Sequence, residues 1–345
     1  MKLKQTLRGC FGHGAFMVLL AMVLTFCLTA GKKQTMIFVI GDSTAAEKSK
    51  PATNPERGWG MVLQGFFDKD VIVDNHAVNG RSSLSFINEG RWQKVLERIK
   101  PGDYVLIQFG HNDEKPDPKR HTVAGGSFDE LLTRYVRETR EKGGIPVLLS
   151  PVARRNFYNI VDSTQEDEAL RKTTFQDEKI NSDTLIDTHG AYRLVARRVA
   201  QQEGCLYIDA NRLTSDLEQQ MGSLGSRKLH MWFAPGEVKS IPKGRHDNTH
   251  YNVYGARLVA GLIADALGQA APALGKHVEH YDYVVSDQGR GNYMSLDEAV
   301  NDAANRCCGG KPCIYVVDGQ WTISKAALKK VRLVVNPAAT VQKTK

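Results

Sequence analysis

From position 35 onward the chain alternates short apolar runs with longer segments in which apolar residues recur at helical spacing. The apolar runs predict strands at 36–40, 71–75, 104–108, 145–149 and 206–208. The segments of helical period include 59–67, 92–99, 128–142, 191–202 and 254–267. A strand followed by a helix, repeated along the chain, indicates a parallel sheet covered on both faces. We therefore expect an α/β fold around a five-stranded parallel sheet.

A break in this pattern follows residue 267. Small residues and a proline lie at 268, 270–272 and 275, and a new apolar run begins at 281. We expect the main domain to span 31–268, a linker to span 269–280 and a second unit to span 281–345. About sixty-five residues is near the lower limit at which a single core sustains itself.

Residues 1–30 have the pattern of an export signal. Basic residues precede an apolar run, and small residues follow up to position 31. The run is shorter than the ~20 residues that a membrane-spanning helix needs, so we expect cleavage, no stable membrane span and a periplasmic or extracellular protein. Cys27 leaves attachment of a lipid open, although Phe26 is bulky for such a site.

Composition and charge exclude several classes of protein. A hydrophobic content of 41% is typical of a globular chain and argues against disorder. The formal charge of +8 includes three basic residues of the signal, and the rest is spread along the chain. So small a surplus does not form the basic stripe of a nucleic-acid binder, but it favours an acidic polymer as substrate.

The cysteines beyond the signal show no metal-site spacing. They are Cys205, Cys307, Cys308 and Cys313. Zinc would need a fourth ligand at suitable spacing, so no metal is predicted. Pairing within the group of three stays open for an exported protein.

Chemistry-bearing residues follow the predicted strands, where the reactive edge of an open parallel sheet lies. Ser43 comes directly after the first strand, in the position of a nucleophile. His250 has the side chain that can take the proton of a serine, and Asp247 three residues earlier can hold its ring. Each of these features is also compatible with a simple helix cap.

Three donors are candidates for stabilising the negative oxygen that develops on an attacked ester. They are the backbone N–H groups of Ser43 and Gly80 and the side-chain amide of Asn112. All three follow consecutive strands. Gly80 as a plain turn glycine and Asn112 as a loop residue remain alternatives.

Taken together, these blocks resemble the SGNH hydrolases, also called the GDSL superfamily, and within them the rhamnogalacturonan acetylesterases. The blocks are IGDSTAA at 40–46, GWG at 58–60, NGRSS at 79–83, EGRW at 89–92, QFGHND at 108–113 and DNTHYN at 247–252. The resemblance covers about 36–268. It implies a flavodoxin-like three-layer sandwich, a catalytic triad of Ser43, Asp247 and His250, an acyl-enzyme intermediate, acetylated pectic polysaccharide as substrate, and no cofactor.

The C-terminal segment, residues 281–345, resembles a different family. Residues 283–293, 296–300 and 314–319 resemble the opening rungs of a pectin methylesterase β-helix. The chain ends before the positions at which such enzymes carry their catalytic residues. We therefore expect a short, partial β-helix-like appendage without activity.

Two other functions compete with the acetylesterase. A thioesterase or lysophospholipase would keep the same fold and would need a long apolar tunnel for its acyl chain. A non-catalytic carbohydrate-binding protein would not need Ser43 and His250 together. The sequence does not indicate an oligomeric state.

Overall fold

The computed structural model describes residues 34–159, 178–306 and 310–345. The predicted export signal, Cys27, Cys307 and Cys308 lie outside the described residues. Among the cysteines that are described, Cys205 and Cys313 are free thiols. No helix in the described ranges is long and apolar enough to cross a membrane.

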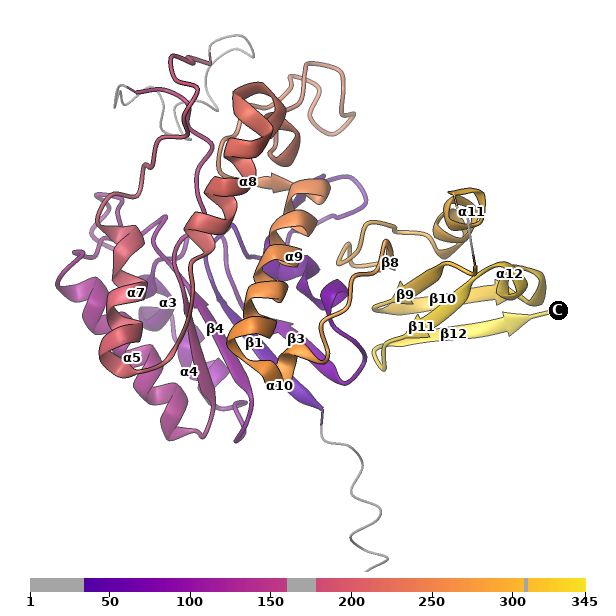
Figure 1. The fold of residues 1–345 in the computed structure, drawn as a ribbon, viewed down its shortest axis with the longest axis horizontal. Coiled ribbons are helices and arrows are strands. Elements are labelled where there is room, and N and C mark those ends of the chain that lie inside the picture. The colour runs from indigo at the N-terminus through magenta and orange to yellow at the C-terminus, as the bar shows by residue number, and fades with distance from the viewer. Residues whose placement is uncertain (1–33, 160–177, 307–309) are drawn as a thin grey trace, which may run out of the picture. The chain divides into compact units, whose positions relative to one another are not determined.

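A five-stranded parallel sheet forms the centre of the fold (Figure 1). Its strands are β1 (Thr35–Gly41), β3 (Val71–Asn75), β4 (Tyr104–Gln108), β5 (Ile145–Leu149) and β6 (Leu206–Ile208). Their order, β3-β1-β4-β5-β6, is that of flavodoxin-like proteins. All five predicted strands are present, and the predicted fold class is confirmed.

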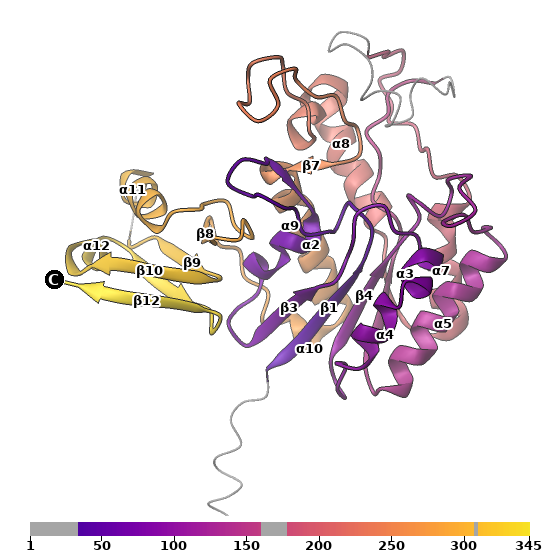
Figure 2. The same cartoon turned by 180° about the vertical axis from the view of Figure 1, so that it is seen from behind.

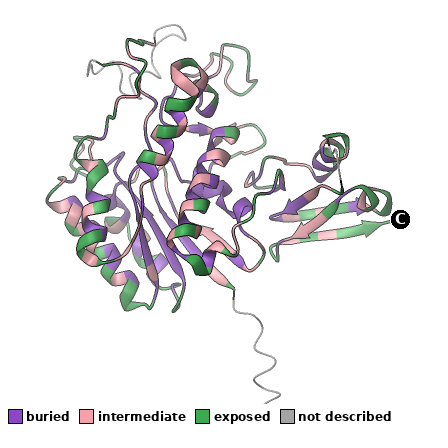
Figure 3. Ribbon diagram, in the orientation of Figure 1, coloured by how far each residue is buried: buried purple, intermediate pink, exposed green. Residues whose placement is uncertain are grey.

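Helices cover both faces of the sheet (Figure 2). On one face lie α2 (Trp59–Val62), the 3-10 helix η1 (Leu63–Phe66), α8 (Ala210–Gly225) and α9 (Val253–Ala270). On the other lie α3 (Ser83–Asn88), α4 (Arg91–Leu96), α5 (Ser127–Glu141) and α7 (Tyr192–Glu203). Successive side chains of β1 alternate between these layers, Ile37 facing the first and Phe38 the second. Both side chains are buried. Figure 3 shows that the central strands are mostly buried, and burial on both faces explains why these strands are continuous apolar runs in the sequence.

The C-terminal segment builds two small parallel sheets. The first has the order β11-β9-β8 and the second pairs β10 with β12. The elements in chain order are β8 (Tyr283–Val285), α11 (Leu296–Arg306), β9 (Cys313–Val316), β10 (Gly319–Ser324), α12 (Lys325–Lys330), β11 (Arg332–Val335) and β12 (Ala339–Thr344). Parallel pairing of successive turns is the pattern of stacked β-helix rungs. The likeness to pectin methylesterase itself stays a prediction.

Buried polar contacts join this segment to the α/β domain. Gln64 Nε2 donates to the Tyr315 hydroxyl at 3.1 Å, and both side chains are buried. Arg57 Nε donates to the carbonyl oxygen of Gly289 at 2.8 Å. Residues Thr35–Lys345 accordingly form one compact unit. The domain limits proposed from the sequence remain a prediction.

Candidate active site

Ser43 lies just beyond the carboxyl end of β1, in a turn that its neighbours hold in place. A Cβ on Gly41 would lie 2.6 Å from the Gln108 carbonyl oxygen, so only glycine fits there. Asp42 Oδ1 accepts hydrogen bonds from the Thr44 N–H at 2.9 Å and the Thr44 hydroxyl at 2.7 Å. Burial opposes ionisation of Asp42, but nearby His111 and the bonds from Thr44 bring its pKa to about 2. The Gly-Asp-Ser motif therefore fixes the backbone around the serine.

His250 joins Ser43 to Asp247. Its Nε2 atom lies 2.9 Å from Ser43 Oγ, and its Nδ1 atom lies 3.0 Å from both carboxylate oxygens of Asp247. The contacts with Asp247 assign the ring proton to Nδ1, which leaves Nε2 to accept from the serine hydroxyl. Asp247 is fully buried, and its Oδ1 also accepts from the backbone N–H groups of Thr249 and His250.

Two short strands anchor the loop that carries His250. The strand β7 (Tyr251–Asn252) follows the histidine directly and pairs antiparallel with β2 (Glu56–Arg57). Asn252 then caps α9, because its side chain accepts from the Gly255 N–H at 3.0 Å. This pairing brings Glu56, almost two hundred residues away in the sequence, beside the histidine.

A chain of alternating charges surrounds the three candidate catalytic residues. Lys48 Nζ contacts Glu56 Oε1 at 2.8 Å, and it donates to the Ser43 carbonyl oxygen at 2.6 Å and to Asn79 Oδ1 at 2.7 Å. Arg245 continues the chain, with Nη1 2.7 Å from Glu56 Oε2 and Nη2 2.6 Å from Asp247 Oδ2. Burial acts to raise the pKa of Glu56, but the charges of Lys48, His250 and Arg245 bring it down to about 2.

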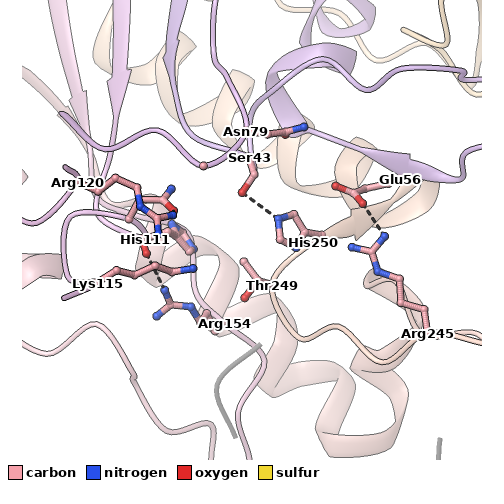
Figure 4. Close-up of a pocket in the computed structure, with 12 residues that line it drawn as sticks. Ser43, Glu56, Asn79, His111, Lys115, Arg120, Arg154, Arg245, Thr249 and His250 are labelled. Carbon is pink, nitrogen blue, oxygen red and sulfur yellow. Dashed lines mark hydrogen bonds and ion pairs between the residues drawn. The ribbon is translucent and has the colours of Figure 1, made fainter. Parts of the chain in front are cut away.

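The predicted oxyanion donors line the same cavity as the serine. Figure 4 shows Ser43 and His250 facing each other in this cavity. Ser43, Gly80, Asn112 and His250 all line this cavity of about 420 Å³, whereas Asp247 lies buried behind the histidine. Gly80 has φ of +74°, a conformation that favours glycine. Asn112 Nδ2 donates to the Arg81 carbonyl oxygen at 3.1 Å, which orients the amide. The structure thus brings all five sequence-predicted site residues together.

The sequence analysis assigned no role to the eight other residues that line the cavity. These are Glu56, Asn79, His111, Lys115, Arg120, Arg154, Arg245 and Thr249. Several fall inside or beside the quoted motif blocks, so proximity to a motif was the available signal. In the described part of the chain, one group has metal-ligand spacing, formed by Asp68, Asp70 and His277, and it contains no residue of the cavity.

This geometry suits nucleophilic attack by a serine. A histidine that is bonded to the hydroxyl and held by a buried carboxylate is the arrangement that removes a serine proton. Donors beside the nucleophile are the arrangement that stabilises an oxyanion. The chemistry that the site can perform is therefore acyl transfer from an ester to water.

Comparison with known proteins agrees with this geometry. Residues 39–258 match the GDSL-like Lipase/Acylhydrolase family. Rhamnogalacturonan acetylesterase RhgT of Bacillus subtilis is 36% identical over 259 residues, which are 75% of this chain and 98% of that protein. The probable rhamnogalacturonan acetylesterase YesY of the same organism is 29% identical over 235 residues, 67% of this chain and 91% of its own. The crystal structure of YxiM from B. subtilis is similar with a TM-score of 0.53 and 26% identity, covering 70% of this chain and 58% of that one.

Proposed function

Because this chain belongs to the GDSL-like lipase/acylhydrolase family, we propose that it is a rhamnogalacturonan acetylesterase, which hydrolyses acetyl esters of a pectic polysaccharide. The observation that carries the proposal is the 2.9 Å contact between Ser43 Oγ and His250 Nε2 at the wall of an open cavity. The 36% identity to RhgT supports the choice of substrate.

The reaction begins with attack of Ser43 Oγ on the acetyl carbonyl carbon while His250 Nε2 takes the serine proton. Asp247 keeps the ring oriented and stabilises the imidazolium that forms. The negative oxygen of the tetrahedral intermediate accepts hydrogen bonds from the Ser43 and Gly80 N–H groups and from the Asn112 amide.

Collapse of this intermediate breaks the bond to the sugar oxygen, and His250 returns the proton to that oxygen. The free sugar hydroxyl leaves, and the acetyl group remains on Ser43. Water then attacks the acetyl-enzyme with His250 again acting as base. A second collapse releases acetate and restores the serine hydroxyl.

The lining of the cavity favours a sugar substrate over a lipid. It contains the side chains of serine, threonine, asparagine, glutamate, histidine, lysine and arginine and no large apolar side chain. A thioesterase or lysophospholipase needs an apolar tunnel for its acyl chain. Acetyl is short enough to need none, and a polar wall offers hydrogen bonds to hydroxyl groups.

We also propose roles for the segments before and after the esterase domain. We propose that residues 1–30 direct export to the periplasm or beyond the cell, with lipid attachment at Cys27 left open, and that residues 31–268 form the esterase domain. Residues 269–280 act as a linker, and residues 281–345 as a non-catalytic appendage. Sequencing the N-terminus of the secreted protein tests the cleavage.

Acetate release from a panel of substrates tests the function. The panel comprises acetylated rhamnogalacturonan, acetylated xylan, an aryl acetate and a lysophospholipid. We expect the highest kcat/KM on rhamnogalacturonan and no turnover of the lysophospholipid. Preference for xylan would keep the chemistry but change the substrate, and preference for the lipid would overturn the proposal.

A further inference from the structure

Lys48 is a buried lysine that the mechanism above does not use. It follows the turn that carries Ser43, and its side chain is only 2% exposed. It does not line the cavity beside the serine, so a substrate bound there does not touch it. A buried ion pair contributes little to stability on balance, because desolvation of the charges offsets their attraction. Stability alone therefore does not account for an ammonium group at this position.

The contacts of this ammonium group join three separate segments of the chain. Lys48 Nζ donates to the Ser43 carbonyl oxygen at 2.6 Å and to Asn79 Oδ1 at 2.7 Å. It also contacts Glu56 Oε1 at 2.8 Å. Ser43 follows β1, Asn79 follows β3, and Glu56 belongs to β2. All three acceptor residues border the cavity, as Figure 4 shows, so Lys48 acts on the site through them.

The number of acceptors indicates that Lys48 carries its charge. Burial lowers the pKa of the Lys48 ammonium, and the negative charge of Glu56 acts to raise it. An ammonium group has three N–H donors, whereas a neutral amine has two. Three acceptors at hydrogen-bonding distance therefore fit the ammonium form.

Asn79 links Lys48 to the second oxyanion donor. The Gly80 N–H belongs to the peptide group that carries the Asn79 carbonyl. A Cβ at Gly80 would meet no atom within 4 Å, so packing does not fix this turn. Hydrogen bonds hold Asn79 instead, because Lys48 binds its side chain and Arg81 Nη1 donates to its carbonyl oxygen at 2.9 Å. The direction of the Gly80 N–H depends on these two contacts.

We propose that Lys48 is a positioning residue that holds the oxyanion donors of Ser43 and Gly80 at a fixed separation. It binds the nucleophile turn through the Ser43 carbonyl and the glycine turn through the Asn79 side chain, while Glu56 anchors the ammonium between them. The two N–H groups then point at the oxyanion before charge develops on it, and no rearrangement is needed during the reaction. This role rests on the proposed function, because it concerns the attack of Ser43 on an ester.

Lys48→Met tests the role, because methionine keeps an apolar stem of similar length and removes the ammonium. We expect kcat for an aryl acetate to fall by about 10²-fold and KM to change by less than about threefold, since misplaced donors weaken the transition state and not the bound ester. The inhibition constant of an arylboronic acid should rise by a similar factor, because its tetrahedral adduct on Ser43 presents an oxygen to the same donors.

Two controls separate positioning from loss of folded protein. The number of sites that a fluorophosphonate labels at completion gives the competent fraction, and kcat is expressed per labelled site. Lys50→Met removes the same charge from an exposed residue of the same loop that does not line the cavity, and it should keep the wild-type kcat.

Asn79→Ala provides a measurement that does not depend on the folding of Lys48→Met. It breaks the link between the lysine and the glycine turn but leaves the ion pair with Glu56, so kcat for the aryl acetate should fall by about tenfold. The double variant Lys48→Met with Asn79→Ala should have the kcat of Lys48→Met alone, because both changes break the same link.

The possible failures are distinguishable. A wild-type kcat per labelled site in Lys48→Met, or a loss confined to KM, would overturn the positioning role and leave the esterase intact. Multiplied losses in the double variant would also overturn it, and so would full activity of Asn79→Ala if Lys48→Met does not fold. Failure of the wild-type protein to hydrolyse either an aryl acetate or acetylated rhamnogalacturonan would overturn the proposed function, and this role with it.

Discussion

Arg245 donates a hydrogen bond of 2.6 Å from Nη2 to Oδ2 of Asp247, an oxygen that also lies 3.0 Å from Nδ1 of His250. The carboxylate that orients the candidate base is therefore shared with a guanidinium. Arg245 is in turn held by Glu56, whose negative charge acts on His250 as well. Three charged side chains, those of Asp247, Arg245 and Glu56, thus lie near the imidazole before any proton moves.

The opposite charges of Arg245 and Glu56 predict opposite effects on the pH profile. Arg245→Gln removes a positive charge near His250. Loss of that charge stabilises the imidazolium, so the acid limb of kcat/KM should move to higher pH. Glu56→Gln removes a negative charge and should move the limb to lower pH. We expect shifts of about half a pH unit, measured on an aryl acetate.

An exposed arginine provides the control for this experiment. Arg212 on α8 has a side chain that is 77% exposed, and Arg212→Gln should leave the profile in place. Shifts in the same direction for the Arg245 and Glu56 variants would show that these side chains act by holding the loops and not by their charge.

Glu56 also predicts how stability depends on pH. Its pKa is about 2 in the folded protein and 4.5 ordinarily, so folding gains from its ionised form. This contribution is fully present above the ordinary pKa and is lost as the pH falls toward 2. The advantage of the wild-type protein over Glu56→Gln in free energy of unfolding should shrink between about pH 7 and about pH 3, by at most about 3 kcal/mol. Urea unfolding at each pH measures it, and a constant difference would contradict the assigned pKa.

Substitutions of Asp247 and of His250 should lower kcat by different amounts. His250→Ala removes the base and should lower kcat by roughly 10⁶-fold, whereas Asp247→Asn removes only the orienting charge and should cost roughly 10⁴-fold. Single-turnover acetate release separates the two. A larger loss in Asp247→Asn would indicate that another group acts as base.

Removal of residues 281–345 should affect stability more than activity. Ser43, Asp247 and His250 all lie before this segment, so acetate release should stay within a few-fold of the parent. Gln64, Arg57 and Arg257 would each lose a hydrogen-bond partner, and the melting temperature should fall by several degrees.

A smaller change isolates one of these contacts. The Tyr315 hydroxyl accepts from Gln64 Nε2 and from Asn336 Nδ2, so Tyr315→Phe should cost about 1–2 kcal/mol in free energy of unfolding without lowering activity.

The truncated protein has an outcome that would contradict the expectation of retained activity. A tenfold loss of activity on removal of residues 281–345 would show that the Gly289 contact to Arg57 supports the neighbouring Glu56.

The sheet was predictable because strands buried on both faces are continuous apolar runs in the sequence. The family was predictable as well, since its motif blocks follow those strands, and the comparisons confirm it. Helix α8 was missed although Leu213, Leu217 and Met221 recur at helical spacing and pack on the core. The many polar residues between these positions obscure that pattern in the sequence.

The charge network was not predictable from the sequence. Lys48 and Arg245 lie in loops and Glu56 lies in the two-residue strand β2, and no periodicity or spacing in the sequence distinguishes these charged residues from solvated surface residues. Their roles depend on the pairing of β2 with β7, which joins segments far apart in the chain. Only the folded structure shows that these charges converge on Asp247 and on the carbonyl oxygen of Ser43.

The most direct test of the account is covalent labelling of Ser43 combined with activity. The protein is treated with a fluorophosphonate, residual acetate release from acetylated rhamnogalacturonan is measured, and the adduct is located by peptide mass mapping. We predict one adduct, on Ser43, in proportion to the activity lost, and neither labelling nor acetate release in Ser43→Ala. Acetate release by Ser43→Ala at the wild-type rate, or inactivation with the adduct on another residue, would contradict the account.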